Sequence, residues 1–145
     1  YGEQVLALMP NSDYGSKKIS DILQKYGDLD LIKIVPHIER SEYLFLLSKA
    51  SILVGNSSSG IIEAGSLGAP VVNIGSRQNS REKGNNVINT KVDKYKIVES
   101  FNKAKNLDKS FFQNPYDIGR SSDKILSLLK TISLDEKVLN KINAY

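Results

Sequence analysis

Residues 52–63, which read ILVGNSSSGIIE, are the stretch from which the fold of this chain can be inferred. Ile52–Val54 form an apolar run typical of a short strand, and Ile61 and Ile62 open a run typical of a helix. Between the two runs lie only glycine, asparagine and serine. Small hydrogen-bonding residues at a strand-to-helix turn are common at the ligand-binding edge of α/β sheets.

The same alternation of short and long apolar patterns continues along the whole chain. Short runs dense in Val, Ile and Leu predict strands that are buried on both faces. These runs are Gln4–Met9, Leu31–Val35, Ile52–Val54, Val71–Ile74 and Asn86–Ile88.

Longer segments between and after the strands show helical spacing. Gly27 is predicted to end the first helix, and Ser41 to cap the second. The helix-defining residues are Ile19, Ile22, Leu23 and Tyr26; Leu44, Leu47 and Ala50; Gly60 to Leu67; Ile97, Phe101 and Ala104; Ile125, Leu128, Leu129 and Ile132; and Val138, Leu139 and Ile142. Strands that alternate with helices predict one α/β domain over residues 1–145, with a parallel sheet flanked by helices.

Composition limits the classes of protein to which the chain can belong. Its 145 residues suffice for one domain with a core, and no apolar run approaches the roughly 20 residues that cross a bilayer. No cysteine is present, so disulfides and thiolate metal sites are excluded, and we expect a cytoplasmic protein without a membrane partner. The net charge of +4 comes with scattered lysines and no nucleic-acid-binding motif, so no nucleic-acid partner is expected. The start at Tyr1, directly before a strand, suggests a fragment of a longer protein.

Four polar loops should lie together, because ligands bind outside the carboxyl ends of parallel strands. They are Pro10–Ser16, Pro36–Arg40, Gly55–Gly60 and the long loop Ser76–Asn86, which reads SRQNSREKGNN. All four are rich in hydrogen-bonding groups, so we expect the binding site at their common edge.

Two interpretations of the serine-rich stretch are open from the residues alone. As a phosphate cradle, Ser57–Gly60 would offer N–H groups and hydroxyls to an anion, Glu63 would accept from a ribose diol, and Arg77 and Arg81 would add positive charge. As a helix cap, the serines and Glu63 would serve only the helix that follows. Three consecutive serines exceed what one cap needs. Gly15 and Ser16 open the first helix and give a second candidate phosphate site.

Several blocks of sequence together resemble a known family. They are GNSSSGIIE (Gly55–Glu63), PVVNIG (Pro70–Gly75), Arg77-Gln78 with Arg81-Glu82, Gly84 with Asn86–Ile88, PNSDYGS (Pro10–Ser16) and NPYDIG (Asn114–Gly119). From Gln4 to about Ile132 the chain resembles the hydrolysing UDP-N-acetylglucosamine 2-epimerases of sialic and related nonulosonic acid pathways. It departs from the family pattern at Gly65-Ser66, where proline and a small residue are common, and at Asp117–Gly119, where Gly-Asp-Gly is usual.

The resemblance implies a GT-B architecture of two Rossmann-like domains, of which this chain, with its Rossmann-like parallel sheet flanked by helices, would be the C-terminal, nucleotide-binding half. It implies a UDP-sugar substrate, elimination of UDP and addition of water to give N-acetylmannosamine, with the catalytic acid and base on the other half. It implies no metal or other cofactor, and a homo-oligomeric parent enzyme. The implied nucleotide-binding residues are Asn56, Ser57, Ser58, Ser59, Gly60, Glu63, Arg77, His37 and Ile38, and the implied residues on the sugar side are Asn11, Asp13, Gly15 and Ser16.

Two other functions fit the same pattern. A GT-B glycosyltransferase would use a similar domain, with a carboxylate on the ribose, to bind its donor nucleotide. A non-catalytic nucleotide- or protein-binding module of the receiver type is the second, although such modules usually cluster acidic residues after the first strand and Asp13 stands alone there. Release of UDP without an acceptor would distinguish the epimerase from the transferase.

Overall fold

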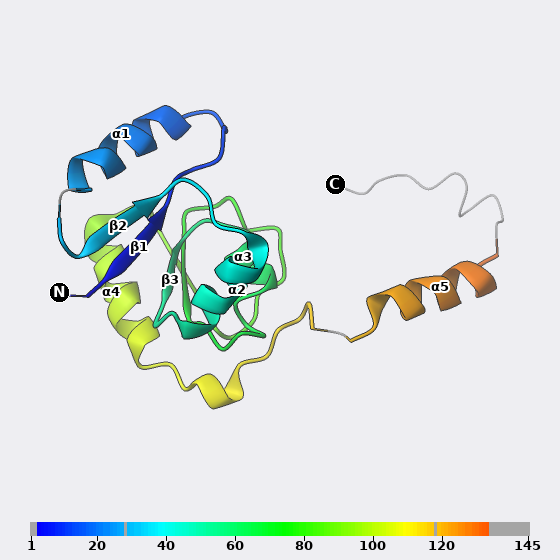
Figure 1. Ribbon diagram of the computed structural model, residues 1–145. Coiled ribbons are helices and arrows are strands. Elements are labelled where there is room, and N and C mark those ends of the chain that lie inside the picture. Colours follow the sequence, from blue (N-terminus) through cyan, green and yellow to red (C-terminus); the bar gives the residue numbers. More distant parts are fainter. Residues whose placement is uncertain (1–2, 28, 118, 134–145) are drawn as a thin grey trace. The chain divides into compact units, whose positions relative to one another are not determined.

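The computed structural model describes residues 3–27, 29–117 and 119–133, and its chain forms two compact units, residues 1–51 and 52–145 (Figure 1). Each unit carries its own parallel sheet. All five predicted strands are present, and the α/β class with parallel strands and helices is confirmed. That the two units form one domain with one sheet remains a prediction.

The first unit is a β-α-β arrangement followed by a further helix. Strand β1 (Val5–Leu8) pairs in parallel with β2 (Ile32–Val35), and Leu8 lies opposite Val35 at the end of the ladder. Helix α1 (Ser16–Tyr26) connects them. Parallel strands need such a crossover, and Gly27 caps the helix as predicted. β1 is largely exposed and β2 is mostly half-buried, so the predicted burial on both faces is wrong for these two strands.

Helix α2 (Arg40–Lys49) begins earlier than the sequence pattern predicts. Its N-cap is Glu39, because the Glu39 carbonyl already accepts from Tyr43 N at 2.8 Å. Ser41 therefore lies inside the first turn, and the prediction that it caps the helix is wrong. Of the predicted apolar face, Leu47 is buried, whereas Leu44 and Ala50 are half-buried.

The second unit contains a three-stranded sheet in the order β3-β4-β5, with all strands parallel. The strands are β3 (Leu53–Gly55), β4 (Val71–Ile74) and β5 (Val87–Thr90). β5 starts one residue later and ends two residues later than predicted. The central strand β4 buries Val71, Val72 and Asn73, which confirms for this strand alone the predicted burial on both faces. Ile61, Ala64, Ala69 and Ala104 complete the core of the unit.

Helix α3 (Ser59–Ile62) is a single turn, so the predicted helix from Gly60 to Leu67 is too long. Tight turns replace the rest: Ala64 N donates to Ser59 O at 3.0 Å, and Ala69 N donates to Ala64 O at 2.9 Å. The segment also packs too closely for a regular helix. A Cβ at Gly65 would lie 3.1 Å from the Cβ of Asn114. Periodicity alone could not reveal this packing, because Asn114 lies far along the sequence.

Three further elements complete the second unit. Helix α4 (Lys94–Lys105) is capped by Asp93, whose carboxylate accepts from Lys96 N at 2.9 Å, and it packs on β4 and β5. A 3-10 turn, η1 (Lys109–Phe111), leads to helix α5 (Ser121–Thr131).

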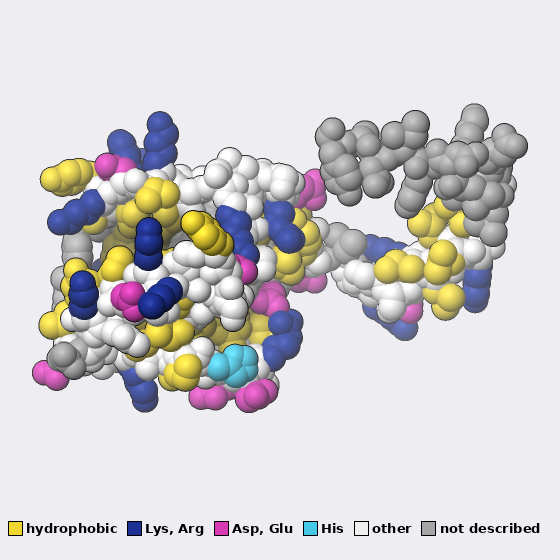
Figure 2. All heavy atoms as spheres, turned by 90° about the horizontal axis from the view of Figure 1, so that it is seen from above, with side chains coloured by type: hydrophobic (Ala, Val, Ile, Leu, Met, Phe, Trp, Pro, Cys, Tyr) yellow, Lys and Arg dark blue, Asp and Glu magenta, His cyan; other side chains and the backbone are white. Residues whose placement is uncertain are grey.

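Helix α5 confirms the fifth helical pattern. The apolar residues Ile125, Leu128 and Leu129 that define this pattern are exposed in the structure. Figure 2 shows apolar side chains gathered along this helix. Ile132 lies just beyond its last residue. The predicted helix around Val138, Leu139 and Ile142 lies outside the described residues. Among the described helices, none combines the length and the apolar character needed to cross a membrane.

Candidate nucleotide-binding loops

A serine loop, residues 56–60, leaves the carboxyl end of β3. Gly55 ends the strand with φ of 153°, a backbone conformation that favours glycine because it carries no Cβ. The loop then enters α3 at Ser59. Because Gly55 lies opposite Asn73 in the β3–β4 ladder, the serine loop and the loop after β4 leave the same edge of the sheet. This agrees with the predicted grouping of loops within this unit.

The three serines do not share one task. Ser58 occupies the N-cap position of α3, but its side chain makes no cap hydrogen bond. Ser57 makes the local hydrogen bonds at the start of α3: its Oγ accepts from Ser59 N at 3.3 Å and lies 3.1 Å from the Ser59 Oγ. The backbone N–H groups of Ser57 and Ser58 donate to no acceptor within the described parts of the chain. The Ser58 side chain is exposed and makes no cap bond. The cap interpretation therefore does not explain the presence of a serine at this position.

A helix dipole would contribute little to anion binding at this loop. α3 has four residues, so the aligned peptide dipoles that build a macrodipole are too few. The available groups are the N–H groups of Ser57 and Ser58 and the serine hydroxyls. Successive N–H groups in a turn form an anion-binding concavity without a long helix.

Gly60 and Glu63 lie beside the loop in different settings. A Cβ at Gly60 would lie 2.9 Å from the Val71 Cγ1 and 3.3 Å from the Leu53 Cδ2, so close packing on the sheet explains this glycine. Glu63 follows α3 directly and is half-buried, with its N–H donating to Ser59 O at 3.0 Å. Glu63 lies one turn after the serines. Its contact with a ribose remains a prediction.

An arginine loop, residues 75–81, follows β4 and reaches back to the serine loop. Arg77 is exposed, whereas its neighbour Gln78 is only 3% exposed. Gln78 Nε2 donates to Asn56 O at 2.9 Å, which joins the two loops directly. Sequence reasoning gave Gln78 no role in the site, because a glutamine in a polar loop resembles any solvated residue. The structure brings together the predicted residues of both loops, Asn56–Gly60 and Arg77.

The remaining predicted site residues lie in the first unit, at the carboxyl edge of its own sheet. Met9 N donates to Val35 O at 3.0 Å, so the loops after β1 and β2 leave side by side. Asn11, Asp13 and Gly15 are exposed, and Ser16, which donates its N–H to Asp13 O at 3.0 Å, is half-buried. Gly15 caps α1 with φ of 86°, so this glycine is required by the turn.

His37 and Ile38 occupy the loop after β2. His37 is exposed, and its Nε2 lies 4.0 Å from the Glu39 Oε1, a surface pair of little energetic weight. Ile38 is half-buried. Each unit thus gathers its own predicted residues at one sheet edge; that the two edges form one site remains a prediction.

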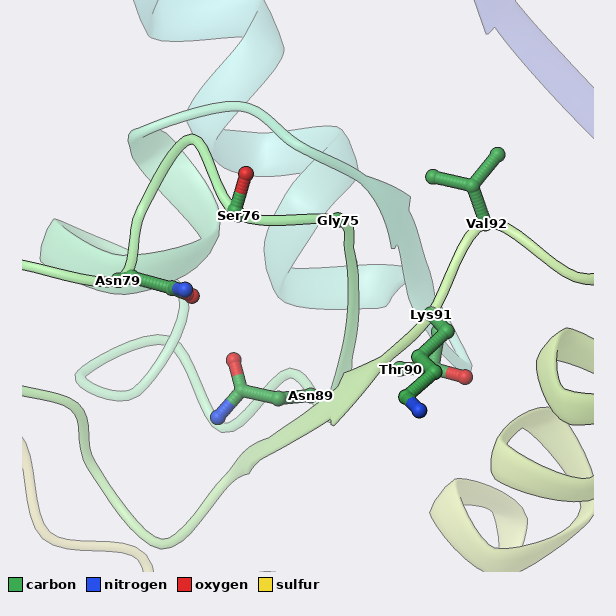
Figure 3. A pocket seen from close by; sticks show the side chains of 7 residues that line it. All are labelled: Gly75, Ser76, Asn79, Asn89, Thr90, Lys91 and Val92. Carbon is green, nitrogen blue, oxygen red and sulfur yellow. The ribbon is translucent and has the colours of Figure 1, made fainter.

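A hollow of about 400 Å³ lies at the carboxyl ends of β4 and β5 (Figure 3). Asn79 and Asn89 point toward the same space within it, and its wall includes Ser76, next to Arg77 in the sequence. None of the predicted ligand-binding residues lines this hollow. Among the residues that the structure describes, no group of three or more His, Asp or Glu side chains could hold a metal ion.

Comparison with known proteins assigns the chain to a family. Residues 2–130 match the family model described as UDP-N-acetylglucosamine 2-epimerase. The chain belongs to this epimerase family. The sequence resemblance to this family is thereby confirmed.

Two curated relatives are similar over much of the chain. The UDP-N,N'-diacetylbacillosamine 2-epimerase (hydrolyzing) of Legionella pneumophila is 43% identical over 98% of this chain and 38% of its own length. The UDP-N-acetylglucosamine 2-epimerase of Neisseria meningitidis serogroup B is 35% identical over 74% of this chain and 28% of its own length. The chain therefore spans well under half the length of these relatives.

A solved structure supports the fold. The Methanocaldococcus jannaschii UDP-GlcNAc 2-epimerase, crystallised with UDP-GlcNAc and UDP, aligns with a TM-score of 0.72 at 20% identity. The alignment covers 88% of this chain and 35% of that one. The chain thus has the fold of one part of a GT-B epimerase.

Proposed function

We propose that this chain is the C-terminal, nucleotide-binding half of a hydrolysing 2-epimerase that acts on a UDP-sugar. The observation that carries the proposal is the family match together with the serine loop, in which the Ser58 hydroxyl makes no cap bond and the N–H groups of Ser57 and Ser58 have no acceptor among the described residues. A diphosphate needs donors of this kind.

The proposed roles follow from the chemistry of the two loops. Ser57, Ser58 and Ser59 would donate to phosphate oxygens, Arg77 would add positive charge, and Glu63 would accept from the ribose hydroxyls. In an elimination, UDP leaves with growing negative charge on its phosphate. Donors held at that position would stabilise the transition state as well as the bound nucleotide.

The loops of the first unit would contact the rest of the substrate. We assign Asn11, Asp13, Gly15 and Ser16 to the sugar-diphosphate side, and His37 and Ile38 to the uracil through their backbone groups. The general acid and base groups would come from a part of the enzyme outside this chain. The full-length enzyme would be cytoplasmic and would form a homo-oligomer. No described group of this chain is assigned as the catalytic acid or base.

The test is a product assay on the full-length protein that contains this chain. We expect incubation with UDP-N-acetylglucosamine to release UDP together with N-acetylmannosamine, in the absence of any acceptor. Release of UDP only when an acceptor sugar is added would instead identify a glycosyltransferase and overturn the proposal.

A second substrate is favoured by one specific observation. The relative with 43% identity is named for UDP-N,N'-diacetylbacillosamine, which differs from UDP-N-acetylglucosamine in its sugar and shares its nucleotide. The same assay with this sugar nucleotide decides between them. A higher kcat/KM for the diacetylated sugar would keep the UDP-binding roles proposed here and change only the assigned sugar.

A further inference from the structure

Gln78 is the buried residue that connects the two loops proposed to bind the nucleotide. Its side chain belongs to the arginine loop, is 3% exposed, and donates from Nε2 to Asn56 O, the first carbonyl of the serine loop, at 2.9 Å. Strands β3 and β4 hold the two loops side by side. The Gln78 bond therefore fixes one loop relative to the other beyond the point where the ladder ends.

The orientation of the Gln78 amide follows from this contact. With the amide reversed, its oxygen would face the Asn56 carbonyl oxygen at 2.9 Å, which is repulsive. In the orientation observed, the Gln78 Oε1 is buried and has no hydrogen-bond partner among the described residues. A buried acceptor without a donor destabilises the folded state, so an apolar side chain of the same size would serve stability at least as well.

We propose that Gln78 is a positioning residue that holds the serine loop against the arginine loop, so that the Ser57 and Ser58 donors and the Arg77 guanidinium meet one diphosphate. The inference rests on the proposed nucleotide-binding function. A polar side chain that is kept at a cost in stability, between two loops of a candidate site, is typical of a residue retained for function.

The decisive variant is Gln78→Met in the full-length protein. Methionine has a similar length, removes the bond to Asn56 and also removes the unpartnered acceptor. We expect its dissociation constant for UDP, measured by titration calorimetry, to rise about tenfold, because loss of the one bond to Asn56 O would no longer hold the two loops in the arrangement that binds the diphosphate. The melting temperature should stay the same or increase. Gln24→Met, at an exposed position of α1, is the matched control and should change neither quantity.

A second variant, Gln78→Glu, separates loop positioning from simple packing. The ionised carboxylate cannot donate a hydrogen bond to Asn56 O, whereas the protonated carboxyl can. Burial raises the pKa of a carboxyl group, so it becomes protonated at a higher pH than an exposed one. We therefore expect UDP binding by this variant, relative to the unmutated protein, to recover as the pH is lowered from about 8 to about 5. A purely structural role predicts that the melting temperature is lowered at pH 8 and recovers in parallel with binding, whereas a positioning role predicts that binding recovers while the melting temperature, relative to the unmutated protein, changes little.

The outcomes separate the inference from the function on which it rests. If the unmutated protein does not bind UDP, the proposed function and this inference both fail. If it binds UDP and Gln78→Met binds equally well, only the inference is overturned. A parallel loss of binding and melting temperature in Gln78→Met would show that Gln78 is structural, which also overturns it.

Discussion

Ser57 and Ser58 are adjacent in the sequence but differ in their hydrogen bonding. Ser57 Oγ accepts from Ser59 N, while the Ser58 side chain makes no cap bond. The sequence indicated that three serines are more than one helix cap needs. The structure shows that Ser58 is the serine that makes no cap bond. The sequence could not show the role of Gln78, because burial between two loops distant along the chain is a tertiary property.

Substitution of each serine should therefore have a different effect. We expect Ser58→Ala in the full-length protein to weaken UDP binding about tenfold, the loss expected for one hydrogen bond to a charged phosphate, without changing the melting temperature. Ser57→Ala is the matched variant and should also lower the melting temperature slightly, because Ser59 N loses its acceptor. A lower melting temperature with unchanged UDP binding in Ser58→Ala would show that this serine is only a cap.

At the scale of elements, the sequence predicted the five described strands and helices α1 to α5 but not the 3-10 turn η1, and the errors in extent lie at the element ends. The start of a helix depends on which backbone carbonyl accepts the first helical hydrogen bond. In α2 this is the carbonyl of Glu39, so Glu39 and not Ser41 is the N-cap. The shortening of α3 depends on Asn114, which is separated from Ile62 by 52 positions. The β-α-β order accounts for the β1–β2 and β3–β4 pairs, whereas β5 follows β4 without an intervening helix. No pattern in the sequence determined how the strands divide between two sheets.

The turn at Asn114 fastens the segment after α3. Asn114 Nδ2 donates to Ile62 O at 2.8 Å and to Ser66 Oγ at 2.7 Å, and its Oδ1 accepts from Tyr116 N at 3.0 Å. Ser66 Oγ in turn donates to Asp117 Oδ2 at 3.2 Å. Ser66 and Asp117 are both among the positions where the chain departs from the family pattern, and the structure places these two departures in contact.

Loss of the Asn114 side chain should therefore destabilise the second unit. We expect Asn114→Ala to lower the free energy of unfolding by about 2 kcal/mol, because three hydrogen bonds disappear at once. Urea denaturation of the purified protein provides the measurement. Asn102→Ala, on the exposed face of α4, should stay within about 0.5 kcal/mol of the unmutated protein. Equal effects of the two substitutions would show that the turn does not fasten this segment.

Helix α4 carries a charge cluster with a defined pH dependence. Hydrogen bonds from Lys103 and Lys96, at 2.8 and 2.9 Å, lower the pKa of Glu99 to about 2. Because the folded pKa lies below the ordinary value of 4.5, the ion pairs stabilise the folded state above about pH 4.5, and this contribution is lost as the pH falls toward 2.

The comparison of Glu99→Gln with the unmutated protein isolates this contribution. We expect the unmutated protein to melt at a slightly higher temperature near pH 6, since the pair is exposed, and the difference to shrink between about pH 4.5 and pH 2. Melting curves at a series of pH values give the result. A difference that does not vary with pH over this range would contradict the assignment.

At the scale of the whole molecule, the chain spans 38% of the length of its Legionella relative. If the acid and base groups lie outside this chain, residues 1–145 expressed alone should not convert UDP-N-acetylglucosamine. A product assay by NMR spectroscopy, which distinguishes N-acetylmannosamine from N-acetylglucosamine, on the purified chain beside the full-length protein tests this. Formation of N-acetylmannosamine by the chain alone would place the catalytic groups within the sequence described here.

The central claim is that the serine loop and the arginine loop bind the nucleotide, and hydrogen–deuterium exchange of the full-length protein with and without UDP tests it most directly. The N–H groups of Ser57 and Ser58, which have no acceptor among the described residues, should exchange rapidly when free and become protected by phosphate. We predict protection of peptides covering residues 55–63 and 76–81, with α4 unchanged. Binding of UDP that protects other segments and leaves these two unchanged would contradict the account.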